Sequence, residues 1–155
     1  MTEEAQVRPK RYLYRSEIKW EGSRKGSLAS LGKPTIQVAP PPEFKGFVGI
    51  WTPEDLLVAA VNSCLMLTFL YHINQGEIEL VSYESEAEGI LEMVEGKLIV
   101  SEIKILPRLS VRSPVDEEKI KTLFRLSKEN CFISNSVKAR IEITPELKIL
   151  NPGAK

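Results

Sequence analysis

The sequence has no excess of charge of either sign. Lysine plus arginine number 21, aspartate plus glutamate also number 21, and the formal net charge is zero. Nucleic acids and anionic membrane surfaces are bound through concentrated positive charge, so the composition gives no electrostatic case for either partner.

Metal-ligating and cross-linking residues are scarce, with two cysteines and one histidine. Two cysteines do not make the disulfide framework of a small secreted protein. Two cysteines and one histidine without CxxC spacing also fall short of the four ligands of a structural zinc site.

The first residues, MTEEAQVRPKRY, lack the apolar segment of a secretory signal peptide. We therefore expect a cytoplasmic protein, where thiols are kept reduced and a cysteine pair is more often catalytic, redox-active or metal-binding than structural. At 155 residues the chain is long enough for one well-cored domain and short for two. We expect a single domain over residues 1–155, with flexible tails at residues 1–10 and 151–155.

The stretch that stands out is TPEDLLVAAVNSCLMLTFLYHI, residues 52–73. Thr52 and Pro53 are typical of a helix start, and Glu54 would lie near the positive end of the helix dipole. No charged residue follows from Leu56 to Ile73. Such a helix is either buried in a core or spans a membrane. The polar pair in its middle and the absence of basic flanks favour a central, buried helix of a soluble domain.

Cys64 lies in the middle of this run, directly after Asn62 and Ser63. Asparagine and serine are good helix caps and poor interior residues, so a kink at this point is an alternative to a straight helix. A kink would place Cys64 in the first turn of a second helical segment, where the helix dipole lowers the pKa of a thiol.

Strand patterns lie on both sides of this helix. Alternating apolar residues predict a small antiparallel meander before it, and Glu95-Gly96-Lys97 predicts a hairpin turn after it. The predicted strands cover residues 12–20, 27–30, 35–38, 78–88, 90–94, 98–105, 109–111 and 139–143, and a second helix opens at Ser113-Pro114 and ends near Asn130. The pattern predicts an α+β fold in which antiparallel sheet packs on two long helices.

Cys64 and Cys131 are the candidate reactive residues. If Cys64 is the attacking thiolate, a peroxide converts it to a sulfenic acid, with which Cys131 can condense to a disulfide. The alternative is a packing role, because free cysteine is among the most buried residue types. Glu54 and Arg24 are further candidates, since an arginine can hold a carboxylate and stabilise a thiolate. The residues alone favour simpler roles, a first-turn dipole residue for Glu54 and an exposed turn charge for Arg24.

Three segments of the chain resemble the OsmC/Ohr family. Thr52 to Cys64, TPEDLLVAAVNSC, is similar to the family motif N-P-E-x-L-x-x-A-x-x-x-x-C, with the same spacing from glutamate to cysteine. Gly22 to Gly26, GSRKG, is similar to the Gly-Gly-Arg-x-Gly turn of the organic hydroperoxide resistance branch, and Glu129 to Ser136 is similar to the segment of the second cysteine. The order of strands, helices and cysteines matches as well. Phe132 departs from the family pattern, which commonly has proline after the second cysteine.

The resemblance implies a thiol-dependent peroxidase that reduces organic or lipid hydroperoxides without a metal or flavin. Cys64 would be the peroxidatic nucleophile and Cys131 the resolving thiol. Arg24 would help to hold Cys64 as a thiolate, and Glu54 would orient that arginine. The family further implies an intertwined homodimer and an external dithiol reductant, which is of the lipoyl type in some members.

Two other functions fit the same residues. One is a binding protein on this fold that holds an apolar ligand at the dimer interface, because a fold does not fix chemistry. The other is an interaction module in which both cysteines are buried and inert.

Overall fold

The computed structural model describes residues 9–112 and 114–151. The chain forms two compact units, Met1–Thr52 and Pro53–Lys155, each of which is described by itself below. The predicted tails lie mostly outside the described residues, and so does Ser113, at which the second helix was expected to open. The prediction of one domain over residues 1–155 stays a prediction.

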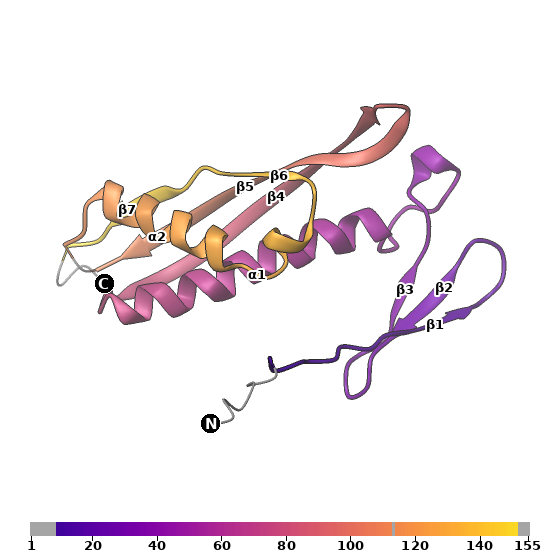
Figure 1. The fold of residues 1–155 in the computed structure, drawn as a ribbon, viewed down its shortest axis with the longest axis horizontal. Helices are drawn as coiled ribbons and strands as arrows, with labels where there is room; N and C mark the ends of the chain where they lie inside the picture. Colours follow the sequence, from indigo (N-terminus) through magenta and orange to yellow (C-terminus); the bar gives the residue numbers. More distant parts are fainter. Residues whose placement is uncertain (1–8, 113, 152–155) are drawn as a thin grey trace, which may run out of the picture. The chain divides into compact units, whose positions relative to one another are not determined.

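The first unit is a three-stranded antiparallel meander (Figure 1). Its strands are β1 (Glu17–Trp20), β2 (Gly26–Ala29) and β3 (Ile36–Val38), and a short 3-10 helix, η1 (Pro42–Phe44), follows them. The Trp20 indole donates a hydrogen bond of 2.7 Å to the carbonyl of Ser23, which closes the β1–β2 turn. The predicted meander is confirmed, but its first strand is shorter than the predicted 12–20.

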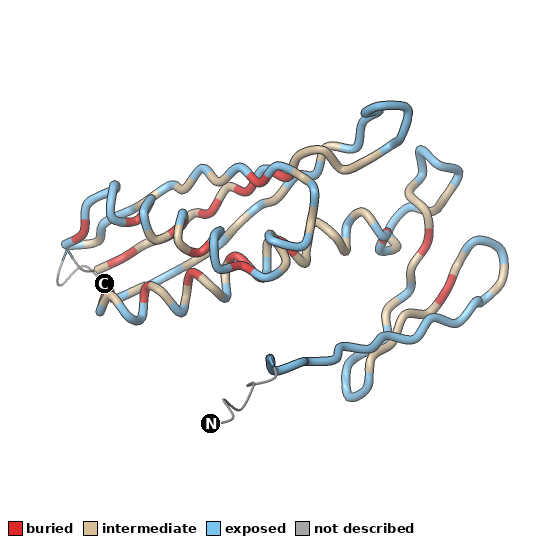
Figure 2. The backbone as a smooth tube through the Cα atoms, in the orientation of Figure 1, coloured by how far each residue is buried: buried red, intermediate tan, exposed pale blue. Residues whose placement is uncertain are grey.

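This unit has almost no core of its own (Figure 2). Among its described residues only Gly26, Ala39 and Thr52 are buried. Every residue of β1 is exposed, including Ile18 and Trp20. A small sheet needs an apolar partner for stability, so the first unit presents an uncovered apolar surface.

The second unit begins with the long helix α1 (Pro53–Gln75), which is continuous over all 23 residues. The predicted kink is therefore wrong, because the polar groups at its centre find partners without a break. The Ser63 hydroxyl donates to the carbonyl of Ala59 at 2.7 Å. The Asn62 side chain accepts a hydrogen bond of 2.6 Å from the Ser85 hydroxyl.

Only one face of α1 is buried in the chain. Val61, Leu65, Phe69 and Ile73 recur every fourth residue and form the buried stripe, whereas Leu67 and Tyr71 are both 62% exposed. The expectation of a helix buried all round is wrong for the single chain. Among the described residues α1 alone is long and apolar enough to cross a membrane, a test of length and composition that core helices of soluble proteins also pass.

The sheet of the second unit is mixed. The strands β4 (Leu80–Val94) and β5 (Lys97–Val111) form a long antiparallel hairpin around Glu95 and Gly96, as predicted. The strands β6 (Arg140–Ile143) and β7 (Glu146–Ile149) both pair with β5 in parallel. The predicted α+β fold, with antiparallel strands packed on two helices, is confirmed. The two parallel pairings add to the antiparallel hairpin, and β7 lies beyond the last predicted strand, residues 139–143.

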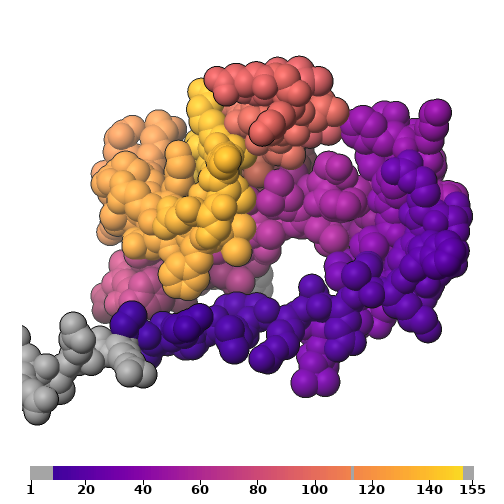
Figure 3. All heavy atoms as spheres, turned by 45° about the vertical axis from the view of Figure 1, so that its right-hand side comes forward, coloured from indigo at the N-terminus to yellow at the C-terminus, as the bar shows by residue number. Residues whose placement is uncertain are grey.

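The helix α2 (Glu117–Asn130) connects β5 to β6 and packs beside α1 (Figure 3). It begins after Asp116, whose carboxylate caps the helix by accepting a hydrogen bond of 2.6 Å from the Lys119 amide. Its end at Asn130 is as predicted. The sheet face toward the helices supplies alternate β5 residues to the core, which also includes the buried stripe of α1 and Ile120 and Phe124 of α2.

Gly89 of β4 allows α1 to approach the sheet closely. A Cβ at this position would lie 2.6 Å from Cγ2 of Val58. We predict that Gly89→Ala lowers the free energy of unfolding by about 1–3 kcal/mol, because the stiff valine and the helix must shift. Urea unfolding monitored by circular dichroism measures the change.

Two further variants isolate the steric cause. A Cβ at Gly76 would have no neighbour closer than 3.6 Å, so Gly76→Ala is the matched control and should leave stability nearly unchanged. In a double-mutant cycle, Val58→Ala should relieve part of the cost of Gly89→Ala. Additive effects of these two substitutions would contradict the proposed clash.

Candidate functional site

The packing of α1 against α2 brings the two cysteines together. Cys64 lies near the middle of α1, and Cys131 is the residue that ends α2. Between the helices the rings of Phe69 and Phe124 stack with centroids 4.1 Å apart. Tyr83 of β4 lies against Phe69 at 5.7 Å, which fixes the helix pair on the sheet.

The sulfur atoms of Cys64 and Cys131 are 2.8 Å apart, and both cysteines are free thiols. A disulfide bond has an S–S length of about 2.05 Å, so a small local movement would join the two sulfurs. Residues 67 positions apart in the sequence thus form a thiol pair that is poised for oxidation.

The two thiols have different environments. Cys131 is completely buried, whereas Cys64 is half-buried. Burial raises the pKa of the Cys131 thiol, and its hydrogen bond with Cys64 raises the pKa further. Cys131 therefore keeps its proton, its S–H donates to the Cys64 sulfur, and Cys64 is the thiol that a reagent can reach.

Helix dipoles do not favour a thiolate at either position. Cys64 is in the interior of a continuous helix, and Cys131 lies at the C-terminal end of α2. The C-terminal end of a helix is its negative pole and disfavours an anion. The predicted activation of Cys64 by a helix N-terminus is therefore wrong.

The turn after Cys131 supplies a contact that the sequence reasoning missed. The Ser134 amide donates a hydrogen bond of 3.4 Å to the Cys131 sulfur. The turn is held by the Asn135 amide, which donates to the Cys131 carbonyl at 3.0 Å. The Ser136 hydroxyl donates to the Phe132 carbonyl at 2.7 Å, away from the thiol. The sequence does contain a signal for this contact, because Ser134 follows Cys131 by three residues and a turn at that spacing can bring its amide to the sulfur.

Glu54 and Arg24 are not joined to the thiol pair within either unit. Glu54 precedes Cys64 by ten residues on one continuous helix, so about 15 Å of helix axis separates them. One carboxylate oxygen of Glu54 is buried and has no hydrogen-bond partner among the described residues. Arg24 belongs to the first unit, is exposed, and donates a hydrogen bond of 2.6 Å to the Phe44 carbonyl. Their predicted roles stay predictions.

His72, the single histidine of the sequence, lies in the last turn of α1. Its Nε2 atom lies 3.4 Å from the side-chain nitrogen Nδ2 of Asn130, the residue before Cys131. Within the described part of the chain no group of three or more histidine, cysteine, aspartate or glutamate side chains could hold a metal ion.

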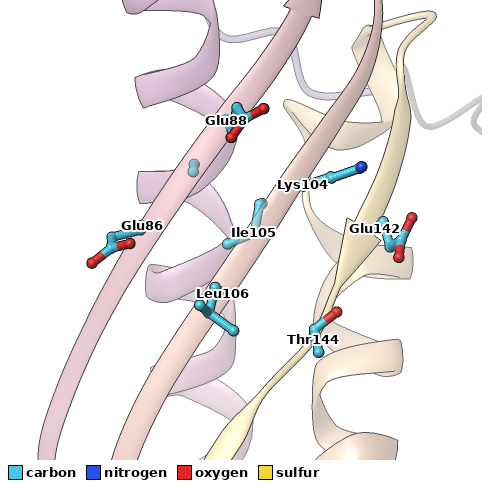
Figure 4. Close-up of a pocket in the computed structure, with 8 residues that line it drawn as sticks. Glu86, Glu88, Lys104, Ile105, Leu106, Glu142 and Thr144 are labelled. Atoms are coloured by element: carbon cyan, nitrogen blue, oxygen red, sulfur yellow. The ribbon is translucent and has the colours of Figure 1, made fainter.

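A groove lies elsewhere, on the face of the sheet away from the helices (Figure 4). It measures about 580 Å³, and its lining includes Glu86, Glu88, Glu142 and Lys104. Arg108 forms an ion pair of 2.8 Å with Glu86 at its side. Neither cysteine lines this groove, and the two thiols lie in contact between the helices, so the thiol pair is the candidate active site.

Known proteins share this fold. An OsmC-like protein of unknown function from Vibrio cholerae superposes with a TM-score of 0.82 at 23% identity, covering 88% of this chain and all of that one. An organic hydroperoxide resistance protein from Legionella pneumophila gives 0.66 at 20% identity, over 90% of this chain and 100% of that one. The organic hydroperoxide resistance protein OhrB of Bacillus subtilis gives 0.59 at 18% identity, over 88% and 98%.

A sequence relative is also found in Bacillus subtilis (strain 168). The uncharacterized protein YmaD is 22% identical over 135 residues, which span 84% of this chain and 89% of YmaD.

A family model described as OsmC-like protein matches residues 46–146, which include α1, α2 and both cysteines. The solved structures agree with it in fold. Because the match spans more than half of the sequence, the chain belongs to the OsmC-like protein family.

Proposed function

We propose that this protein is a cysteine-based peroxidase that reduces organic hydroperoxides. The observation that carries the proposal is the distance of 2.8 Å between the half-buried sulfur of Cys64 and the buried sulfur of Cys131. The names of the structural neighbours from Legionella pneumophila and Bacillus subtilis, organic hydroperoxide resistance proteins, support the choice of substrate class.

In the first step the thiolate of Cys64 attacks one peroxide oxygen of the substrate. The O–O bond breaks, the alkoxide leaves and takes a proton to become the alcohol, and Cys64 is oxidised to a sulfenic acid. In the second step the thiolate of Cys131 attacks the Cys64 sulfur, the S–S bond forms, and hydroxide leaves as water once protonated. An external dithiol, such as one of the lipoyl type, then reduces the disulfide by thiol–disulfide exchange.

Three further features belong to the same proposal. Arg24 helps to hold Cys64 as a thiolate and Glu54 orients Arg24, since a guanidinium can pair with a carboxylate and a thiolate together. The protein acts in the cytoplasm, where a dithiol reductant is maintained. It acts as a homodimer, in which a second copy of the chain covers the exposed apolar face of α1.

The mechanism predicts different defects for the two cysteines. Cys64→Ser should abolish consumption of cumene hydroperoxide, because serine cannot form the sulfenic acid. Cys131→Ser should consume about one equivalent per chain and then stop, with a sulfenic acid that dimedone traps at Cys64. A ferric–xylenol orange assay for peroxide and mass spectrometry of the adduct measure both outcomes.

The wild-type protein separates this function from its rivals. One equivalent of cumene hydroperoxide should remove both free thiols. Free thiols that persist, together with a lipid that copurifies, would instead identify a binding protein. Free thiols that react with iodoacetamide only after unfolding would indicate inert, structural cysteines.

The dimer proposal rests on the exposed face of α1. Leu67 and Tyr71 each expose 62% of their surface on a helix whose opposite stripe is completely buried. Contiguous apolar surface on a soluble protein marks an interaction site. We infer that a second copy of the chain covers this face.

A charge on that face should therefore break the dimer. We predict that Leu67→Asp shifts the protein from dimer to monomer, as measured by light scattering after size-exclusion chromatography, because the carboxylate would be desolvated in the interface. Thr122→Asp, which adds the same charge on the exposed face of α2, should leave the dimer intact. A wild-type protein that is monomeric at micromolar concentration would refute the proposal.

A further inference from the structure

Ser134 carries a buried hydroxyl whose role the proposed steps do not yet include. Its oxygen is inaccessible to solvent and has no hydrogen-bond partner among the described residues. A buried hydroxyl without a partner costs free energy. Such a group in a native structure therefore calls for a reason, and a catalytic role is one of them.

The unused hydroxyl belongs to the residue whose backbone contacts the buried thiol. The Ser134 amide donates to the Cys131 sulfur at 3.4 Å. The Ser134 side chain and amide each lower the pKa of the Cys131 thiol, against the larger effect of burial, which raises it. A negative charge on Cys64 also raises the pKa of the Cys131 thiol by electrostatic repulsion.

The second step of the proposed reaction has an electrostatic difficulty at this point. Cys131 must lose its proton before it can attack the sulfenic acid of Cys64, because the thiolate is the nucleophile. Its sulfur is completely buried, and burial of an anion without hydrogen bonds is expensive. The negative end of α2 adds to that cost.

We propose that Ser134 is a catalytic residue of the resolving step, which stabilises the Cys131 thiolate with its amide N–H and its hydroxyl. This inference rests on the proposed function for the step that it serves. In the resting state Cys131 is a thiol that donates to Cys64, and the hydroxyl has no anion to bind. Once Cys131 ionises, the two Ser134 donors face a charge, and hydrogen bonds to charged groups are the stronger ones.

The turn is built to hold these donors in place. The Asn135 amide donates to the Cys131 carbonyl at 3.0 Å, and the Asn135 side chain donates to the Glu129 carbonyl at 2.9 Å. These bonds tie the turn to the last residues of α2 on both sides of Cys131. Preorganised donors need no rearrangement when the charge appears, which is how such groups favour a reaction.

The first experiment measures the thiolate itself and needs no peroxidase activity. In a Cys64→Ala background Cys131 is the single thiol, and its ionisation is followed by the ultraviolet absorbance of the thiolate. We expect Ser134→Ala to raise the midpoint by about one pH unit, which corresponds to the loss of one hydrogen bond to a charged group. Ser134→Thr, which keeps the hydroxyl, should restore the original midpoint.

Ser136→Ala is the matched control, because it removes a hydroxyl from the same turn that donates to the Phe132 carbonyl and not to the thiol. It should leave the midpoint unchanged. The inference is overturned if Ser134→Ala titrates like the parent protein, or if Ser136→Ala shifts the midpoint equally. Thermal unfolding of each variant shows whether the turn remains folded.

The second experiment places Ser134 in the reaction with both cysteines present. After one equivalent of cumene hydroperoxide, Ser134→Ala should consume peroxide at the parent rate but form the disulfide about threefold to tenfold more slowly. A pKa raised by about one unit lowers the thiolate fraction about tenfold, which sets the upper bound. A thiolate with a higher pKa is a better nucleophile, which offsets part of that loss and gives the lower bound of about threefold. Equal rates of disulfide formation would overturn the inference, whereas a parent protein that consumes no peroxide would refute the proposed function and leave the titration result standing.

Discussion

The contact on which the thiol site depends is the packing of α1 across α2. Phe69 and Phe124 stack in parallel with ring centroids 4.1 Å apart, and both rings are buried. This contact lies one to two helical turns from Cys64 on α1 and from Cys131 on α2. Protein interiors are close-packed and transmit strain, so a change in this pair of rings would alter the sulfur–sulfur distance directly. The distance between the two sulfurs is thus set by apolar packing between the helices.

Cys64 and Cys131 have identical side chains, but their positions in the fold give the two thiols different exposure to solvent. Cys64, in a helix interior, keeps part of its surface exposed, whereas Cys131 ends its helix under a turn that covers it completely. Desolvation favours the neutral form of a thiol, so the buried residue is the one that holds the proton. In the proposed peroxidase reaction this asymmetry would set the order of the two oxidation steps, because the accessible thiol is the one that a peroxide would meet first. Ser134 then supplies donors where ionisation is hardest.

The sequence predicted those elements whose formation depends on neighbouring residues. Pro53 and the apolar run after it gave the long helix, and Glu95-Gly96 gave the hairpin turn. The kink was wrong because Asn62 gained a tertiary partner, Ser85, that lies 23 residues away and has no local signal. The strand β7 was missed because it pairs in parallel with the distant strand β5, and such pairing leaves no hairpin turn in the local sequence from which to predict it. The residues suggested Cys64 and Cys131 as a reactive pair and the family resemblance assigned their roles, but their distance could not be predicted, because spacing alone says nothing of a contact across 67 positions.

Access to the thiol pair and assembly of the protein are linked by the geometry of α1. Leu67 and Tyr71 follow Cys64 by three and seven positions, and residues at these spacings lie on the same side of a helix. Both side chains are exposed in the single chain. Whatever covers them therefore also lies beside Cys64, where the proposed mechanism places the hydroperoxide. Under that proposal, an apolar border would suit the alkyl part of the substrate and exclude water, which strengthens electrostatic interactions in a site. The exposed face of the helix would then be part of an active site that a single chain leaves unfinished.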